Sequence, residues 1–164
     1  MTKIFAHRGA SAYAPENTME AFELAAKQGA DGIELDVHVT KDGEVVVTHD
    51  EKIDRVSNGS GFIKDMTLRE LKRLSFHNHM ESYVGAGIPT LREVLEYVST
   101  TNMDVNIELK TGIYWYPQIE EKTAFIVQET GMHDRVIYSS FNHHSIAKIK
   151  EIDSTAETAW LFSD

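Results

Sequence analysis

Three acidic residues lie in stretches of the chain that have the pattern of β-strands, where charged side chains are unusual. Glu34 and Asp36 are two residues apart in one such stretch, so they project from the same face with Cα atoms about 7 Å apart. Glu108, from a later strand, is a natural third ligand if the strands lie side by side. Carboxylates this close repel each other unless a cation lies between them. Three carboxylates without cysteine favour Ca²⁺ or Mg²⁺ over zinc, and the alternative is a pair of ordinary solvent-facing acids on an edge strand.

Two histidines end predicted strands and are the candidate proton carriers. His7 ends the first strand and His49 follows the third, and histidine titrates near neutrality without help from its surroundings. Asp42-Gly43 is a strong turn signal. A two-residue hairpin there would place Asp36 directly opposite His49, whereas a parallel crossover is the alternative, and the sequence does not choose between them. The other histidines have no such context and receive no role: His38, His77, His79, His133, His143 and His144.

Fixed positive charge accompanies the acidic residues. Arg8 follows His7, and Lys110 follows the strand that carries Glu108. Arginine binds phosphate through a planar fork and lysine binds it as a point charge, so both could hold a phosphodiester. They could equally neutralise the neighbouring acids. The aromatic run 114–116 could wall a substrate pocket or pack under a helix.

Strand-like and helix-like stretches alternate along the chain, which is typical of an α/β fold with a parallel sheet, either doubly wound or closed into a barrel. The expected strands cover residues 4–7, 33–39, 45–47, 105–109, 136–141 and 158–162. The expected helices include three that begin with the capping-box pairs Asn17/Glu20, Thr67/Glu70 and Thr90/Glu93, and two that cover 119–129 and 145–152. Polar residues at the carboxyl ends of consecutive strands predict a ligand site at that edge.

The length of 164 residues fits one domain, 1–164, or a piece of a larger one. A closed eight-stranded TIM-type (β/α) barrel needs about 250 residues. Six predicted strands therefore indicate a barrel that is truncated after about six strands. Unpaired strand edges are a liability in water, so the chain is either a fragment or an incomplete unit that self-associates through the open edge.

Composition narrows the partners. The formal charge is −10, from 26 acidic and 16 basic residues, and such a surface repels nucleic-acid phosphates. An anionic substrate must therefore meet a local cation cluster or a metal. No apolar run approaches the roughly 20 residues of a membrane span, and the first residues are too short in apolar length for a secretory signal. Together with the absence of cysteine, these features favour a cytoplasmic protein without stable membrane insertion.

The chain resembles the glycerophosphodiester phosphodiesterase family of phospholipase-C-like barrels. The resemblance rests on short motifs that follow one another in family order: 7–9 (HRG), 15–18 (PENT), 32–37 (GIELDV), 47–50 (VTHD), 88–91 (IPTL) and 106–110 (NIELK). It implies an eight-stranded barrel with an insertion after the third strand, here at about 51–88. It also implies hydrolysis of glycerophosphodiesters to glycerol 3-phosphate and an alcohol, with one divalent cation.

Carried over motif by motif, the resemblance implies a role for each candidate residue. The implied metal ligands are Glu34, Asp36 and Glu108, the implied acid/base pair is His7 and His49, and the implied phosphate-side cations are Arg8 and Lys110. Two other readings stay open. One is phospholipase-type activity on a lipid phosphodiester, and the other is a truncated module that binds a ligand or another chain without turnover.

Overall fold

The structure is a computed structural model, and it describes residues 2–162. Within this range six strands form one sheet: β1 (Phe5–His7), β2 (Gly32–Val39), β3 (Val45–Val47), β4 (Asp104–Leu109), β5 (Val136–Ser140) and β6 (Glu157–Trp160). Five of them run parallel in the order β1-β2-β4-β5-β6. Apart from β3, strands that are consecutive in the chain are neighbours in the sheet. This is the strand order of a (β/α) barrel, and it confirms the predicted fold class.

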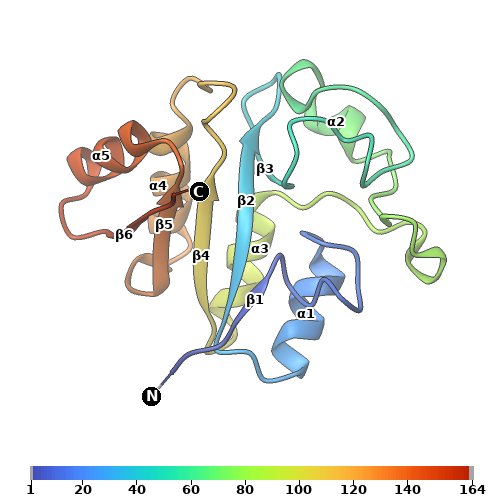
Figure 1. The fold of residues 1–164 in the computed structure, drawn as a ribbon, viewed down its shortest axis with the longest axis horizontal. Coiled ribbons are helices and arrows are strands. Elements are labelled where there is room, and N and C mark those ends of the chain that lie inside the picture. Colours follow the sequence, from blue (N-terminus) through green and yellow to red (C-terminus); the bar gives the residue numbers. More distant parts are fainter. Residues whose placement is uncertain (1, 163–164) are drawn as a thin grey trace.

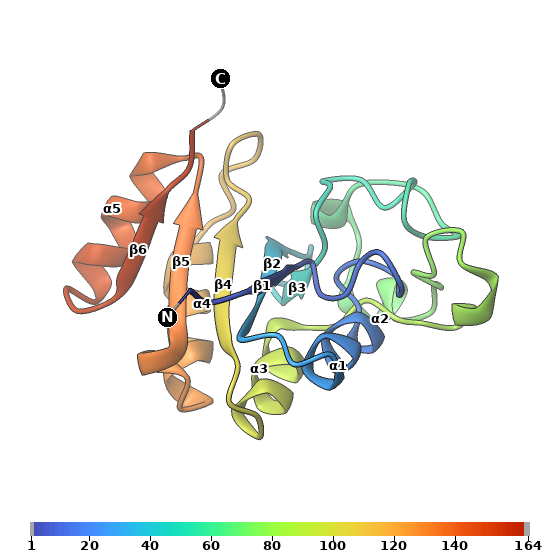
Figure 2. The same ribbon diagram turned by 60° about the horizontal axis from the view of Figure 1, so that its bottom comes forward.

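Five α-helices connect the strands: α1 (Met19–Lys27), α2 (Leu68–Leu71), α3 (Leu91–Ser99), α4 (Ile119–Glu129) and α5 (His143–Ile152). Three short 3₁₀ helices cover Ile63–Asp65, Glu81–Tyr83 and His133–Arg135. In Figure 1 the helices α4 and α5 lie beside β5 and β6, whereas the loops between β3 and α3 lie on the opposite side of the molecule, and Figure 2 shows the same separation.

The period-2 alternation of the strands sorts apolar from polar side chains. Ile33, Leu35 and Val37 of β2 are fully buried in the main hydrophobic core, and β4 contributes its own alternate residues to the same core. The helices α1, α3, α4 and α5 add residues to that core, as do β3 and β5. Because successive side chains of a strand point to opposite faces, Glu34 and Asp36 face away from the helices.

The link between β2 and β3 is an antiparallel hairpin, not a parallel crossover. Val37 pairs with Val47 and Val39 with Val45, so Asp36 lies opposite Thr48, whose backbone N–H donates to the Asp36 carbonyl (3.0 Å). The two-residue hairpin that would have set Asp36 against His49 is therefore wrong by one residue. Beyond the strand ends the Thr40 N–H still donates to the Glu44 carbonyl (2.9 Å), which leaves three residues, 41–43, at the tip of the hairpin. The last of them, Gly43, has φ of +88°, a conformation that glycine adopts without strain.

Helix starts follow the capping signals in two cases of three. Thr67 with Glu70 and Thr90 with Glu93 form complete capping boxes. At α1 the prediction was wrong, because the N-cap is Thr18, whose hydroxyl accepts from the backbone of Ala21. Asn17, the residue expected there, has a left-handed backbone (φ +56°) and uses its side chain elsewhere.

Residues 51–88, which we call the 51–88 segment, form a largely irregular region. A small second hydrophobic cluster lies there. Val46 of β3 joins this cluster, whose other buried members are Ile53, Val56, Ile63, Leu71, Phe76 and Ile88. Its interpretation as an insertion into the barrel stays a prediction.

The sheet is open among residues 2–162. β6 pairs with β5 alone there, and Trp160 at its end is 60% exposed. Self-association through this edge stays a prediction. None of the described helices has the length and apolar character needed to cross a membrane.

Candidate active site

Three carboxylates meet on the face of the sheet that is turned away from the helices. Asp36 and Glu108 are direct neighbours in the β2–β4 register, and Glu34 lies one alternation earlier on β2. One oxygen from each of these three carboxylates lies within 4.8 Å of the others. The structure thus brings together all three predicted metal ligands, which we call the acidic cluster.

The electrostatics of the acidic cluster leave negative charge without full compensation. Burial, together with the charges of Asp36 and Glu108, raises the pKa of Glu34 to about 8. Asp36 is almost completely buried, and its Oδ1 has no hydrogen-bond partner among the described residues. Buried oxygens of this kind are costly unless something binds them. An all-oxygen donor set with an unpartnered buried oxygen fits a hard divalent cation.

Arg8 and Lys110 border the acidic cluster from opposite sides. The Lys110 ammonium donates to Glu108 Oε1 (2.9 Å) and lies 3.7 Å from Asp36 Oδ1. The Arg8 guanidinium lies 3.5 Å from Asp36 Oδ2 through its Nε. Both cations are therefore placed as the sequence predicted, next to the acids.

The loop between β1 and α1 approaches the acidic cluster with its backbone. Arg8 has a left-handed backbone (φ +56°), and its N–H donates to both the carbonyl oxygen (3.0 Å) and the Oε2 (3.1 Å) of Glu34. Gly9 follows with φ of +78°, and a Cβ at this position would lie 2.8 Å from the Ala21 backbone. The tight turn therefore needs glycine.

Asn17 makes a contact with Asp36 that the sequence did not predict. Its side-chain amide donates to Asp36 Oδ2 (2.9 Å), and the residue is buried. Its position before a helix resembles an ordinary N-cap, so the sequence carries no signal that separates the two roles.

Both predicted proton carriers lie at the rim of the acidic cluster. His49 Nε2 lies 3.3 Å from the Lys110 ammonium, and its Nδ1 lies 2.6 Å from Asp50 Oδ1. His7 Nε2 lies 3.7 Å from Glu34 Oε2, and its side chain is 69% exposed. One imidazole is thus held on both nitrogens, while the other is open to solvent.

His38, to which the sequence assigned no role, supports the backbone of His49. It is fully buried, with its Nε2 3.0 Å from the His49 carbonyl and its Nδ1 2.8 Å from the Tyr116 hydroxyl. Because a carbonyl only accepts, Nε2 carries the proton and Nδ1 accepts from the tyrosine. Burial lowers the pKa of His38, which favours this neutral form. Tyr116 therefore packs in the interior, whereas Trp115 is exposed.

A second ion-pair network surrounds Asp50. Arg55 donates through Nε to Asp50 Oδ2 (2.7 Å) and through both terminal nitrogens to the two oxygens of Glu16 (2.7 and 2.9 Å). Glu16 also accepts from Arg8 Nη1 (3.2 Å). Neither Glu16 nor Arg55 was a predicted site residue, since their partners lie in different loops.

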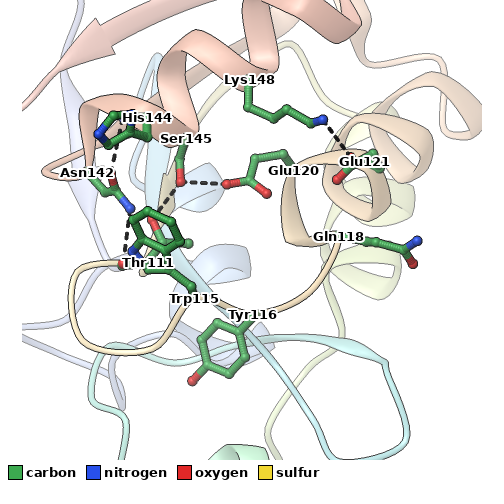
Figure 3. A pocket seen from close by; sticks show the side chains of 10 residues that line it. All are labelled: Thr111, Trp115, Tyr116, Gln118, Glu120, Glu121, Asn142, His144, Ser145 and Lys148. Carbon is green, nitrogen blue, oxygen red and sulfur yellow. Dashed lines mark hydrogen bonds and ion pairs between the residues drawn. The ribbon is translucent and has the colours of Figure 1, made fainter.

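A pocket of about 320 Å³ lies between the N-terminal ends of α4 and α5 (Figure 3). The Ser145 hydroxyl lies at its centre, 2.6 Å from Glu120 Oε1 and 2.7 Å from the Thr111 hydroxyl. At its far side, Lys148 pairs with Glu121 (3.2 Å). Thr111 directly follows Lys110, so its hydrogen bond to Ser145 holds the loop after β4 in place. We call it the Ser145 pocket.

The described part of the chain is thus a (β/α) barrel sheet with a carboxylate cluster on the face turned away from the helices, bordered by two cations and two histidines. Residues 7–164 match the model of the glycerophosphoryl diester phosphodiesterase family, and the chain belongs to this family. It is 51% identical to a glycerophosphodiester phosphodiesterase of Caldanaerobacter subterraneus subsp. tengcongensis over 152 residues, which cover 92% of this chain and 63% of that protein.

Solved structures of glycerophosphodiester phosphodiesterases have a similar fold. A glycerophosphodiester phosphodiesterase from Agrobacterium tumefaciens superposes with a TM-score of 0.88 at 38% identity, covering 96% of this chain and 66% of that one. An Oleispira antarctica phosphodiesterase in complex with the product sn-glycerol-3-phosphate superposes with a TM-score of 0.89 at 32% identity, covering 99% of this chain and 67% of that one. The chain thus spans about two thirds of the length of these relatives.

Proposed function

We propose that the protein hydrolyses glycerophosphodiesters to glycerol 3-phosphate and an alcohol. The observation that carries the proposal is the acidic cluster, in which burial and like charge raise the pKa of Glu34 to about 8 while a buried Asp36 oxygen has no hydrogen-bond partner among the described residues. Family membership supports the same reaction class, and the Oleispira antarctica relative holds sn-glycerol-3-phosphate as its product.

Glu34, Asp36 and Glu108 would hold one divalent cation, Mg²⁺ or Ca²⁺. When bound, such an ion supplies Lewis-acid stabilisation of phosphate charge and lowers the pKa of a coordinated hydroxyl. Arg8 and Lys110 would offset the remaining phosphate charge. Their contacts with Asp36 and Glu108 at the acidic cluster support this role.

His7 and His49 would move the protons. One imidazole takes the proton of the glycerol hydroxyl, whose oxygen attacks phosphorus, and the other gives a proton to the alkoxide as its bond to phosphorus breaks. Water then opens the resulting cyclic phosphate to glycerol 3-phosphate. The Asp50 contact on Nδ1 leaves Nε2 of His49 directed at Lys110 and the acidic cluster.

The test is release of glycerol 3-phosphate from glycerophosphocholine by the full-length protein, with and without EDTA. We expect release that EDTA abolishes and that Mg²⁺ or Ca²⁺ restores. Glu108→Gln should lose the release, whereas Glu96→Gln, a change at an exposed position of α3, should keep it. No chelator-sensitive release would contradict the proposal and favour a binding module without turnover.

Substrate source and location belong to the same proposal. A small soluble phosphodiester fits a protein of formal charge −10 better than a lipid in an anionic membrane. We also propose a cytoplasmic location. Flotation with phosphatidylcholine vesicles tests this choice: protein that floats with the vesicles would favour the phospholipase-type reading.

A further inference from the structure

The His49 imidazole is held by a chain of charged groups that ends in the 51–88 segment. His49 Nδ1 contacts Asp50 Oδ1 at 2.6 Å, and the other oxygen of Asp50 accepts from Arg55 Nε at 2.7 Å. A carboxylate only accepts, so Nδ1 carries the proton. Although burial opposes ionisation, Arg55 and His49 hold the pKa of Asp50 at about 2, and the carboxylate is therefore ionised at neutral pH.

Arg55 is held in turn by Glu16. The two terminal nitrogens of Arg55 donate to the two oxygens of Glu16 at 2.7 and 2.9 Å, a paired geometry that a planar guanidinium makes and an ammonium does not. The Glu16 side chain is only 11% exposed. Burial alone would raise its pKa, but Arg55 and Arg8 hold the pKa below its ordinary value.

The same carboxylate connects Arg55 to the opposite side of the acidic cluster. Glu16 Oε1 accepts from Arg8 Nη1 at 3.2 Å, and Arg8 Nε lies 3.5 Å from Asp36 Oδ2. One guanidinium of the 51–88 segment thus restrains a candidate proton carrier through Asp50 and a candidate phosphate-side cation through Glu16.

We propose that Arg55 is a positioning residue for His49: by bridging Asp50 and Glu16 it holds the imidazole with its proton on Nδ1 and its unprotonated Nε2 directed at Lys110 and the acidic cluster. Through this one side chain the 51–88 segment would contribute to turnover. The proposal rests on the proposed function for its kinetic test, and the tautomer of His49 tests it independently of activity.

The kinetic test compares Arg55→Met, Arg55→Lys and Asp50→Ala with glycerophosphocholine as substrate. Loss of a positioning contact can cost up to about 100-fold in rate, so Arg55→Met should lower kcat about 10-fold or more while KM stays within about threefold. Arg55→Lys keeps the positive charge and should therefore recover part of the loss. The recovery should be incomplete, because one ammonium cannot bridge both carboxylates as the planar guanidinium does. If Arg55 acts through Asp50, Arg55→Met in the Asp50→Ala background should add little further loss.

The matched control is Lys72→Met. Lys72 pairs with Glu93 at 2.6 Å and likewise joins the 51–88 segment to the rest of the fold, but it lies outside the network around His49. This variant should keep the wild-type kcat. An equal loss in Lys72→Met would overturn the proposal, since any anchoring of the segment would then suffice. A kcat for Arg55→Met within twofold of the wild type would also overturn it. The same holds if the double variant loses kcat by the product of the two single-variant factors, since Arg55 would then act independently of Asp50.

Nitrogen-15 NMR of the imidazole supplies the second readout. Neutral His49 should carry its proton on Nδ1 in the wild type and should become a mixture of tautomers in Arg55→Met, or in Glu16→Gln if Arg55→Met does not fold. A wild-type proton on Nε2, or an unchanged tautomer in these variants, would overturn the proposal. If the wild type releases no glycerol 3-phosphate, the proposed function fails, and this measurement alone decides the role of Arg55.

Discussion

The acidic cluster and the Ser145 pocket are both built from polar side chains at the carboxyl-terminal side of the sheet, yet they differ in how well those polar groups are matched. In the Ser145 pocket the hydroxyls of Ser145 and Thr111 bond to each other, Glu120 accepts from Ser145, and Lys148 pairs with Glu121. In the acidic cluster one oxygen from each of three carboxylates lies within 4.8 Å of the others, and a buried oxygen of Asp36 has no hydrogen-bond partner among the described residues.

This difference separates polar groups that stabilise the fold from polar groups kept ready for a ligand. Buried polar groups are normally satisfied within the protein, and a fully satisfied network has little left to offer a substrate. Carboxylates that raise one another's pKa bind a cation more strongly than a matched network would. We therefore expect changes in the acidic cluster and its rim to alter turnover, and changes in the Ser145 pocket to alter stability.

The largest expected effect is on turnover at the rim of the acidic cluster. His49→Ala or His7→Ala should each lower kcat about 10²–10⁴-fold, the usual contribution of one proton transfer. Folding should survive, because His7 is largely exposed and His49 lies at a strand end. The check is kcat with glycerophosphocholine together with far-UV circular dichroism. Near-wild-type turnover in either folded variant would end its assignment as a proton carrier.

The next effect is on stability as a function of pH in the absence of divalent cations. Glu34 has a pKa of about 8 in the folded state against an ordinary 4.5, so the folded chain binds this proton more tightly. Its contribution to stability is therefore fully present below pH 4.5 and is lost as the pH rises through 8, at up to about 1.4 kcal/mol per pH unit. Urea unfolding in EDTA between pH 5 and 9 measures this loss.

Glu34→Gln should flatten that pH dependence, because the amide does not titrate. Glu96→Gln, at an exposed position of α3, should leave the slope as in the wild type. An identical slope in the wild type and Glu34→Gln would show that Glu34 is not the group responsible.

The smallest effect is expected in the Ser145 pocket. Ser145→Ala removes the hydroxyl that joins Thr111 to Glu120 and should lower the free energy of unfolding by about 1–3 kcal/mol, the cost of leaving buried partners unpaired. Turnover should stay within about twofold of the wild type. A large loss of kcat without loss of stability would place this pocket in the reaction and would remove the contrast with the acidic cluster.

Much of this contrast was already visible in the sequence. The alternation in 33–39 and in 105–109 predicts which side chains face away from the helices, and the parallel register of β2 and β4 then brings Asp36 next to Glu108. The signals at Thr67 and Thr90 predict their helix starts because a capping box is local.

What the sequence did not predict depends on contacts between distant segments or on a single residue of loop length. The third loop residue shifted the β2–β3 register by one, so that Thr48 and not His49 faces Asp36. The contacts of Asn17 with Asp36 and of Arg55 with Glu16 join separate loops, and no local periodicity reports such pairs. His38 likewise appears as an ordinary strand residue until Tyr116 is folded over it.

The claim on which the proposed chemistry depends is that the three carboxylates together hold one doubly charged ion. Isothermal titration of the metal-stripped chain with Mg²⁺ and with Ca²⁺ tests it most directly, with Asp36→Asn and Glu96→Gln measured beside the wild type. We expect one ion per chain in the wild type and in Glu96→Gln, and at least 10-fold weaker binding in Asp36→Asn. Absence of binding to the wild type, or equal affinity in Asp36→Asn, would contradict the claim.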